Sequence, residues 1–312
     1  MTVAPIFIVY APPFSINNGG AIFLHRMVHE LRRLGEEAYL YPMKPRELTG
    51  RRDRVKQTVR GLLKLQDPPQ KPFVMSDALD TSVFPDEALP PNAIALYTEI
   101  HEENPLGAQH VARWILYKPG YLGRPADFPR DNLFFKGSEL SDDPRITGGA
   151  QLLQLFWVNP VYRDTGNTNR SGSCYMVRKA RKMRPNFELV HDMENSQQVD
   201  GLSHQELARI FNECETFYCY DDATMYSQFA ALCGCTSIVI PWHYKNRAEW
   251  TAARPLTEYG VAYGLDDIEH ARTTRHLLPG LLAEREEIGR QTVRDFVAAC
   301  RQRFGSDLSQ TD

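Results

Sequence analysis

Residues 172–241 read GSCYMVRKARKMRPNFELVHDMENSQQVDGLSHQELARIFNECETFYCYDDATMYSQFAALCGCTSIVIP, and this stretch decides the fold. It contains three short runs rich in aromatic and β-branched residues, which predict buried parallel strands. The helical pattern between the second and third runs ends at Gly234 and predicts a crossover helix. The three predicted strands are SCYMV (173–177), TFYCY (216–220) and CTSIVI (235–240).

The turns after the first two strands carry groups able to bind a phosphate. Ligands of open α/β sheets collect beyond the carboxyl ends of the strands, where helix N-termini present free N–H groups. The first turn is basic and would neutralise the charge that builds on a leaving diphosphate; the alternative is a solvated basic turn. The second turn predicts a helix that starts near Ala223 and has an aspartate as its N-cap. The residues expected to bind the substrate here are Arg178, Lys179, Tyr220, Asp221, Asp222, Thr224 and Ser227.

The order of these elements resembles the nucleotide-sugar-binding half of a GT-B glycosyltransferase. The resemblance rests on the strand followed by Arg-Lys, the helix QELARIFN (205–212), the strand followed by DDAT (221–224), and AALCGC (230–235) ahead of a strand that ends in Pro241. It implies a GT-B fold of the α/β class, with two Rossmann-like domains facing across a cleft, a nucleotide-sugar donor and no cofactor.

The chain departs from the family pattern at the segment that holds the donor ribose. Many retaining members carry two glutamates there, whereas Asp221, Asp222 and Thr224 stand at the position of the first. The ribose contact and the stereochemical outcome therefore stay open. A second likeness, to bacterial polysaccharide glycosyltransferases, lies in Asn-Pro-Leu (104–106) and Pro-Gly (119–120) around a predicted helix.

The length of 312 residues suits two domains of about 150 residues each. The polar segment 138–149 is the expected linker, so we predict an acceptor-side domain over 1–145 and a nucleotide-sugar-binding domain over 146–312. The charged amphipathic pattern over 281–304 predicts one long helix. By the resemblance, that helix would return toward the first domain.

Composition excludes several classes of protein. A formal net charge of −3 gives no reason to expect nucleic acid as a partner. The six cysteines lack CxxC pairs and matching histidine spacing, so reduced, buried thiols are expected. The apolar run at 5–11 is too short for a signal peptide, and no stretch reaches the roughly 20 residues of a membrane span, which predicts a cytoplasmic protein.

The segment 44–64 carries eight basic residues against two acidic ones, with apolar residues at near-helical spacing. One interpretation is a basic amphipathic segment that rests on anionic lipid or an anionic acceptor, which would make the protein peripheral to a membrane. The other is a solvated helix or loop.

The first half of the chain predicts a βαβ unit. A strand at 6–10 leads to Gly19 and Gly20, then to a helix that ends at Gly35, and the next strand covers 38–41. No GxGxxG is present, which argues against a dinucleotide site. The resemblance to GT-B enzymes implies that Gly19 and Gly20 let donor phosphate and acceptor approach the backbone, and the alternative is a simple turn that needs a positive φ.

A third strand at 93–97 opens onto TEIHEENP (98–105). Acidic and imidazole groups at a strand's carboxyl end lie where a general base would act on the acceptor hydroxyl. The candidates are Glu99, His101 and Glu102; the alternative is a solvated acidic loop. Residues 108–117 are expected to form a helix.

The sequence thus predicts a glycosyltransferase that moves a sugar from a nucleotide-sugar donor to a glycan, lipid-linked or other hydroxyl acceptor. No Asp-x-Asp occurs, so no metal site is expected, and no nucleophile elbow, Walker loop or zinc spacing supports another enzyme class. Two alternatives stay open. One is a non-catalytic binding or scaffold subunit of a polysaccharide assembly system, and the other is a sugar-nucleotide epimerase of the same fold.

Overall fold

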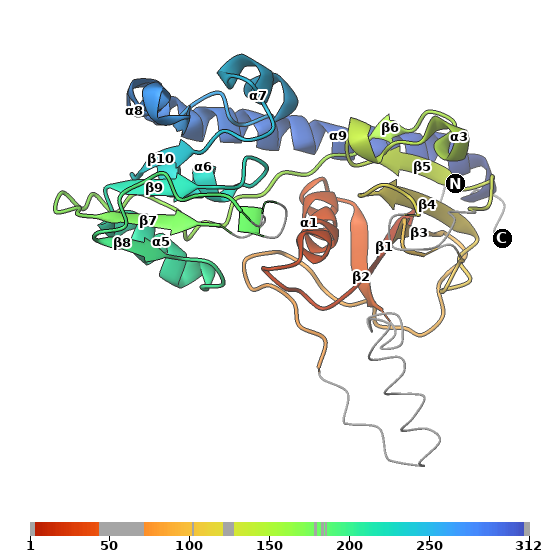
Figure 1. The fold of residues 1–312 in the computed structure, drawn as a ribbon. Helices are drawn as coiled ribbons and strands as arrows, with labels where there is room; N and C mark the ends of the chain where they lie inside the picture. The colour runs from red at the N-terminus through yellow and green to blue at the C-terminus, as the bar shows by residue number, and fades with distance from the viewer. Residues whose placement is uncertain are drawn as a thin grey trace, which may run out of the picture. The chain divides into compact units, whose positions relative to one another are not determined.

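The structure is a computed structural model, and it divides the chain into two compact units (Figure 1). The first unit comprises Met1–Trp157 and Glu286–Asp312, and the second comprises Val158–Arg285. The residues described are 4–43, 72–101, 103–120, 128–177, 180–181, 184 and 186–308.

The first unit contains a six-stranded parallel sheet in the order β2-β1-β3-β4-β5-β6. Its central strands are buried along their whole length, as the continuously apolar runs predict. The elements are β1 (Ile6–Ala11), α1 (Gly19–Arg33), β2 (Glu37–Pro42), β3 (Ala93–Thr98), β4 (His110–Ile115), β5 (Leu133–Lys136) and β6 (Gln151–Leu152).

The expected helix over 108–117 is wrong, because β4 occupies His110–Ile115. This strand lies between β3 and β5, and all six residues are buried. A strand covered on both faces has no two-residue alternation, so the sequence pattern did not distinguish it from a helix. Arg113 is fully buried here because its guanidinium donates to Asn132 Oδ1 and to the carbonyls of His101 and Glu103.

The segment 138–149, expected as the linker, is folded within the first unit. It forms a 3-10 turn (Glu139–Ser141) and the short helix α3 (Pro144–Thr147), whose N-cap Asp143 accepts from Arg145 N. The chain passes to the second unit after Trp157.

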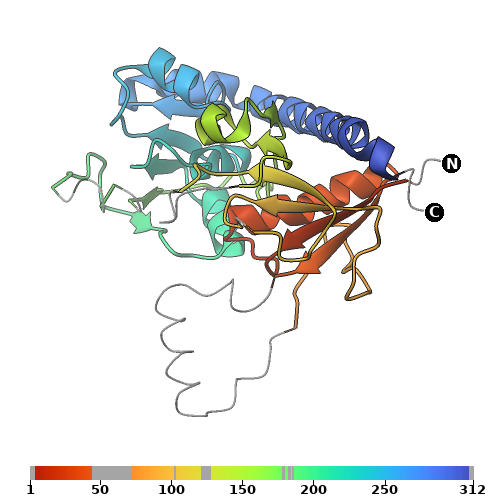
Figure 2. The ribbon, with the colours of Figure 1, turned by 90° about the vertical axis from the view of Figure 1, so that its right-hand side faces the viewer.

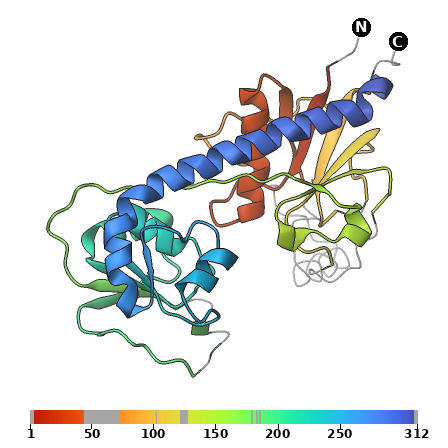
Figure 3. The same ribbon diagram turned by 90° about the horizontal axis from the view of Figure 1, so that it is seen from above.

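The long helix α9 (Leu278–Leu308) forms where the charged amphipathic pattern predicts it. Its latter half packs with α1 on the first sheet (Figures 2 and 3), and Phe296 contacts the rings of Phe7 and Phe135. Thr292 Oγ1 donates to Gln154 O and accepts from Gln154 N, both at 3.0 Å. The helix therefore completes the core of the first unit.

The second unit contains a five-stranded parallel sheet in the order β11-β10-β9-β7-β8. The three strands predicted from residues 172–241 are β7, β9 and β10. Its elements are β7 (Ser173–Met176), β8 (Ser196–Gln198), α5 (His204–Glu213), β9 (Thr216–Cys219), α6 (Tyr226–Leu232), β10 (Thr236–Val239), α7 (Arg247–Ala253), β11 (Val261–Tyr263) and α8 (Ile268–Thr274).

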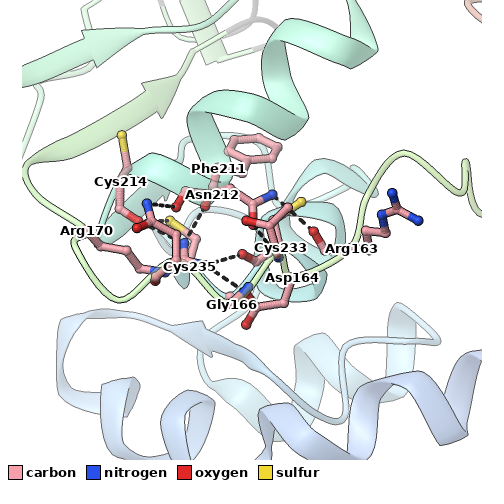
Figure 4. Close-up of polar contacts among 12 residues, drawn as sticks. Arg163, Asp164, Gly166, Arg170, Phe211, Asn212, Cys214, Cys233 and Cys235 are labelled. Atoms are coloured by element: carbon pink, nitrogen blue, oxygen red, sulfur yellow. Dashed lines mark hydrogen bonds and ion pairs between the residues drawn. The ribbon is translucent and has the colours of Figure 1, made fainter.

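Residues 163–170, an irregular segment before β7, are held against the second unit by hydrogen bonds of Arg170 (Figure 4). The guanidinium donates to Phe211 O at 2.8 Å and Cys233 O at 2.6 Å, carbonyls at the C-terminal ends of α5 and α6, and to Asp164 Oδ1 at 3.1 Å. Helix C-termini leave carbonyls without partners, and a cation satisfies both their hydrogen bonding and their partial negative charge. Gly234 has a φ of +91°, and a Cβ there would collide with the Arg170 guanidinium.

Asn212 fastens the same segment from α5 (Figure 4). Its Oδ1 accepts from Thr165 N and Oγ1, both at 2.9 Å, and its Nδ2 donates to Arg163 O at 3.1 Å. The nearby cysteines are free and buried, as expected for thiols that pack as apolar groups.

Two units, each with a parallel sheet of Rossmann-like strand order, confirm the α/β class and the GT-B fold expected from the sequence. In the part of the chain that the structure describes, no helix combines the length and apolarity needed to cross a membrane. The basic segment 44–64 lies outside the described residues.

Candidate functional site

Each sheet has a point where the strand order reverses, and such switch points are where ligands bind in open α/β sheets. In the first sheet the reversal lies between β1 and β3, and in the second it lies between β7 and β9. The carboxyl ends of these four strands are followed by most of the predicted site residues.

At the first edge, Gly19 and Gly20 are the first two residues of α1. Neither has a positive φ, so they are helical residues rather than the turn that the alternative interpretation required. The Asn18 side chain caps the helix by accepting from Ala21 N at 3.2 Å. The first amides of this 15-residue helix have no partner in the helix, as is usual at an N-terminus, and can bind an anion.

Glu99 follows β3 and supports the loop after β4. Its Oε2 accepts from Leu116 N at 2.9 Å. Burial raises the pKa of this carboxyl, although the backbone hydrogen bonds from Leu116 and Tyr117 oppose the shift. A carboxylate whose pKa is raised is a stronger base than an exposed one.

His101 is poorly suited to act as a general base. Its ring is buried against Tyr10 and Tyr97, with ring centroids 5.1 and 6.2 Å away. Burial and then the Arg113 charge lower the pKa of His101 to about 4, which keeps the imidazole neutral at physiological pH. Glu102, the third predicted base, lies outside the described residues.

The second edge contains a buried aspartate paired with an exposed histidine. His243 follows β10, and its Nδ1 lies 2.8 and 3.0 Å from the two carboxylate oxygens of Asp222, which follows β9. The Asp222 side chain is fully buried, whereas 41% of the His243 side chain is exposed. Because a carboxylate only accepts, Nδ1 carries a proton, and Nε2 is left to bind a ligand or exchange a proton.

The loop that carries His243 is held from two sides. Asp222 Oδ2 accepts from His243 N at 2.9 Å, and Trp250 Nε1 donates to Asp222 O at 2.9 Å. The Tyr263 hydroxyl donates to Tyr244 O at 2.8 Å and accepts from Trp242 N and Tyr244 N. These bonds fix both partners of the pair before any ligand arrives, which is the arrangement that electrostatic catalysis requires.

An aromatic ring and a guanidinium accompany the pair. The Trp242 ring centroid lies 3.7 Å from that of His243 and 4.3 Å from Arg184 Cζ. Arg184 also donates from Nη2 to Tyr220 O at 3.2 Å, which places this cation at the end of β9. The edge therefore presents an aromatic ring that can stack on a nucleobase, and a guanidinium and an imidazole that can bind a phosphate.

The helix after β9 begins later than expected. Helix α6 starts at Tyr226, its N-cap is Met225, and no side chain caps it. Neither aspartate can be the cap, because Asp221 Oδ1 accepts from Ala223 N at 3.0 Å in a local turn and Asp222 binds His243. The predicted N-cap is therefore wrong.

Several predicted ligands point inward. The Tyr220 hydroxyl accepts from Val190 N at 2.8 Å in the core, and Ser227 is buried with its hydroxyl 2.9 Å from Gln228 Oε1. Thr224 is partly exposed, and its Oγ1 accepts from Tyr226 N at 3.5 Å. Among the second-turn candidates, only Thr224 presents a side chain at the edge apart from the Asp222 pair.

The basic turn after β7 lies outside the described residues at Arg178 and Lys179. The preceding amide, Val177 N, donates to the Asp200 carboxylate at 3.0 and 3.3 Å, so Asp200 already occupies the amide at the end of this strand. Among described residues, no group of three or more His, Cys, Asp or Glu side chains could hold a metal ion.

His243, Trp242 and Arg184 were not among the residues predicted from the sequence. A signal was present, because PWHY (241–244) directly follows a predicted strand, as DDAT (221–224) does. Because ligands of open α/β sheets bind beyond the carboxyl ends of strands, the residues after the third predicted strand were also candidates for the site.

No protein-family model matches the chain, and no curated protein matches it. Among solved structures, it is similar to a mutant O-GlcNAc transferase from Thermobaculum terrenum, at 12% identity and a TM-score of 0.46, over 99% of this chain and 69% of that one. A UDP-GlcNAc 2-epimerase from Methanocaldococcus jannaschii is similar at 8% identity and a TM-score of 0.41, over 94% and 100% of the two chains. T4 phage BGT, solved with its UDP-glucose substrate, is similar at 7% identity and a TM-score of 0.38, over 96% and 99%.

Proposed function

We propose that this chain is a glycosyltransferase that transfers a sugar from a nucleotide-sugar donor to a hydroxyl acceptor without a metal ion. The observation that carries the proposal is the pair formed by buried Asp222 and exposed His243 at the carboxyl edge of the second sheet. A parallel sheet collects phosphate at this edge, and the pair supplies a preorganised proton donor there.

The second unit binds the donor in this proposal. Protonated His243 donates from Nε2 to a diphosphate oxygen, and the negative Asp222 stabilises the resulting imidazolium. Arg178 and Lys179 add positive charge to the same diphosphate. As the bond from the anomeric carbon to the diphosphate oxygen breaks, charge grows on that oxygen, so these groups stabilise the transition state more than the bound donor.

The first unit supplies the acceptor side in this proposal. Glu99 takes the proton from the attacking hydroxyl; it follows β3 at the carboxyl edge of the sheet, and burial raises its pKa, which makes the carboxylate a stronger base. The new bond joins the acceptor oxygen to the anomeric carbon, and the nucleoside diphosphate leaves.

The test is turnover of a panel of nucleotide sugars in EDTA, with and without a mixture of glycan acceptors. Release of nucleoside diphosphate that rises with acceptor and persists in EDTA supports the proposal. Conversion of the sugar nucleotide alone, without acceptor, would identify an epimerase. Nucleotide binding without any turnover would identify a binding or scaffold subunit.

A further inference from the structure

The first unit holds a cavity that is not part of the edge where β1 and β3 end. It has a volume of about 750 Å³ and is lined by residues before β5 and β6, by α3 and by the last turns of α9. Residues 130–132 precede β5, and residues 148–150 precede β6, so the cavity lies at the amino ends of these strands. All strands of this sheet are parallel, so the cavity and the switch point occupy opposite edges.

The charge of the lining is positive. Arg130, Arg145 and Arg303 contribute guanidinium groups, and none of the lining residues is acidic. Asp143 binds Arg145 at 2.7 and 2.9 Å and neutralises one of the three. Within the described residues, Arg303 donates only to the carbonyl of Asp131, at 3.5 Å, and Arg130 forms no hydrogen bond or ion pair. Two guanidinium groups thus keep donors for a ligand.

The rest of the lining suits a sugar. The side chains of Gln151 and Gln302 are exposed and form no hydrogen bond within the described residues, so their amides can serve hydroxyl groups. Phe134 and Ile146 give an apolar wall that belongs to a small core cluster. The volume lies within the range of small-molecule sites, roughly 300–1,000 Å³.

We infer that this cavity binds an oxyanion-bearing saccharide, a sugar or short glycan with a carboxylate or phosphate, at a site separate from the proposed donor site. Planar guanidinium groups bind carboxylate and phosphate oxygens in pairs, the amides bind hydroxyls, and the apolar wall packs on the C–H face of the ring. The inference does not depend on the proposed glycosyl transfer.

The test is isothermal titration of the full chain with a glucuronate-containing tetrasaccharide, a neutral glucose tetrasaccharide, and inorganic phosphate as competitor. The variant is Arg130→Ala with Arg303→Ala. The matched control is Arg294→Ala with Arg301→Ala, which removes the same charge from α9 residues outside the cavity lining. Thermal unfolding of both variants checks that they fold.

We expect the acidic tetrasaccharide to bind the native chain and the control equally, to within about twofold. Loss of two charge-assisted contacts should weaken its binding to the cavity variant by at least about tenfold. Phosphate should compete and the neutral tetrasaccharide should not bind. Asp222→Asn, a change at the proposed donor site, should leave the affinity unchanged.

Equal binding to both variants would show a diffuse electrostatic effect and overturn the inference. So would equal binding of the neutral tetrasaccharide, or no binding of the acidic one at millimolar concentration. Equally weakened binding to Asp222→Asn would assign the saccharide to the donor site and also overturn it.

Discussion

Replacing Asp222 with asparagine tests the pair at the second edge with the smallest change in shape. The carboxylate accepts from His243 N at 2.9 Å and from His243 Nδ1 at 2.8 and 3.0 Å. An amide keeps one acceptor and turns the other oxygen into a donor. Two donors of His243 then face one acceptor, so the ring must change tautomer or move.

The expected loss follows from these contacts. One charge-assisted hydrogen bond at a buried group contributes about 1.5–3 kcal/mol, and the stabilised imidazolium is lost with it. Removing one preorganised donor to developing charge typically costs about 10²- to 10³-fold in rate. We therefore expect Asp222→Asn to lower turnover about 10²-fold or more while thermal unfolding shows a folded protein.

The assay is steady-state release of nucleoside diphosphate from the donor found in the substrate panel. Asp192→Asn is the control, because it removes the same charge from an exposed turn of the same unit. His243→Gln should lower turnover similarly, and the double variant should lose little more, because the two residues act together. Turnover of Asp222→Asn within about threefold of the native rate would refute the role of the pair.

Three further predictions concern stability, pH and the first unit. Arg170→Met should lower the free energy of unfolding of the second unit by about 3 kcal/mol in denaturant melts, since buried carbonyls lose their partner; an effect no larger than that of exposed Arg163→Met would contradict this. His101 is neutral when folded, so its contribution is complete above about pH 6.5 and is lost as the pH falls toward 4. The native chain should therefore lose up to about 3 kcal/mol more than His101→Phe between pH 7 and pH 4, and parallel pH curves would refute this. Glu99→Gln should lower acceptor-dependent turnover about 10²-fold with unchanged donor affinity, and normal turnover would remove Glu99 as the base.

Strands β7, β9 and β10 could be predicted because their short apolar runs are rich in aromatic and β-branched residues and are followed by turns, which favours buried parallel strands. The same rule failed at β4, where buried Arg113 broke the apolar run. Its guanidinium donates hydrogen bonds to Asn132 and to the carbonyls of His101 and Glu103. The local sequence pattern does not predict these contacts. Hydrophobic periodicity cannot identify a buried strand in which a charged side chain is paired through tertiary contacts.

The candidate site was only partly predictable for a related reason. Strand ends placed the Asp221 and Asp222 turn correctly at a sheet edge, but the role of Asp222 depends on His243, 21 residues further along the chain. The Asp222 carboxylate binds His243, and the Asp221 carboxylate accepts from Ala223 N in a local turn. Helix α6 therefore starts without a side-chain cap. The Tyr220 side chain points inward, where its hydroxyl accepts a hydrogen bond from Val190 N.

The most direct test of the central claim is the ¹⁵N spectrum of the His243 imidazole during titration with a nucleoside diphosphate in EDTA, assigned by comparison with His243→Gln. We expect Nδ1 to be protonated throughout, because it faces Asp222, and the signal of Nε2 to move toward the shift of a protonated nitrogen as nucleotide binds. A nucleotide that binds with both His243 nitrogens unchanged would contradict the claim that this pair holds the diphosphate.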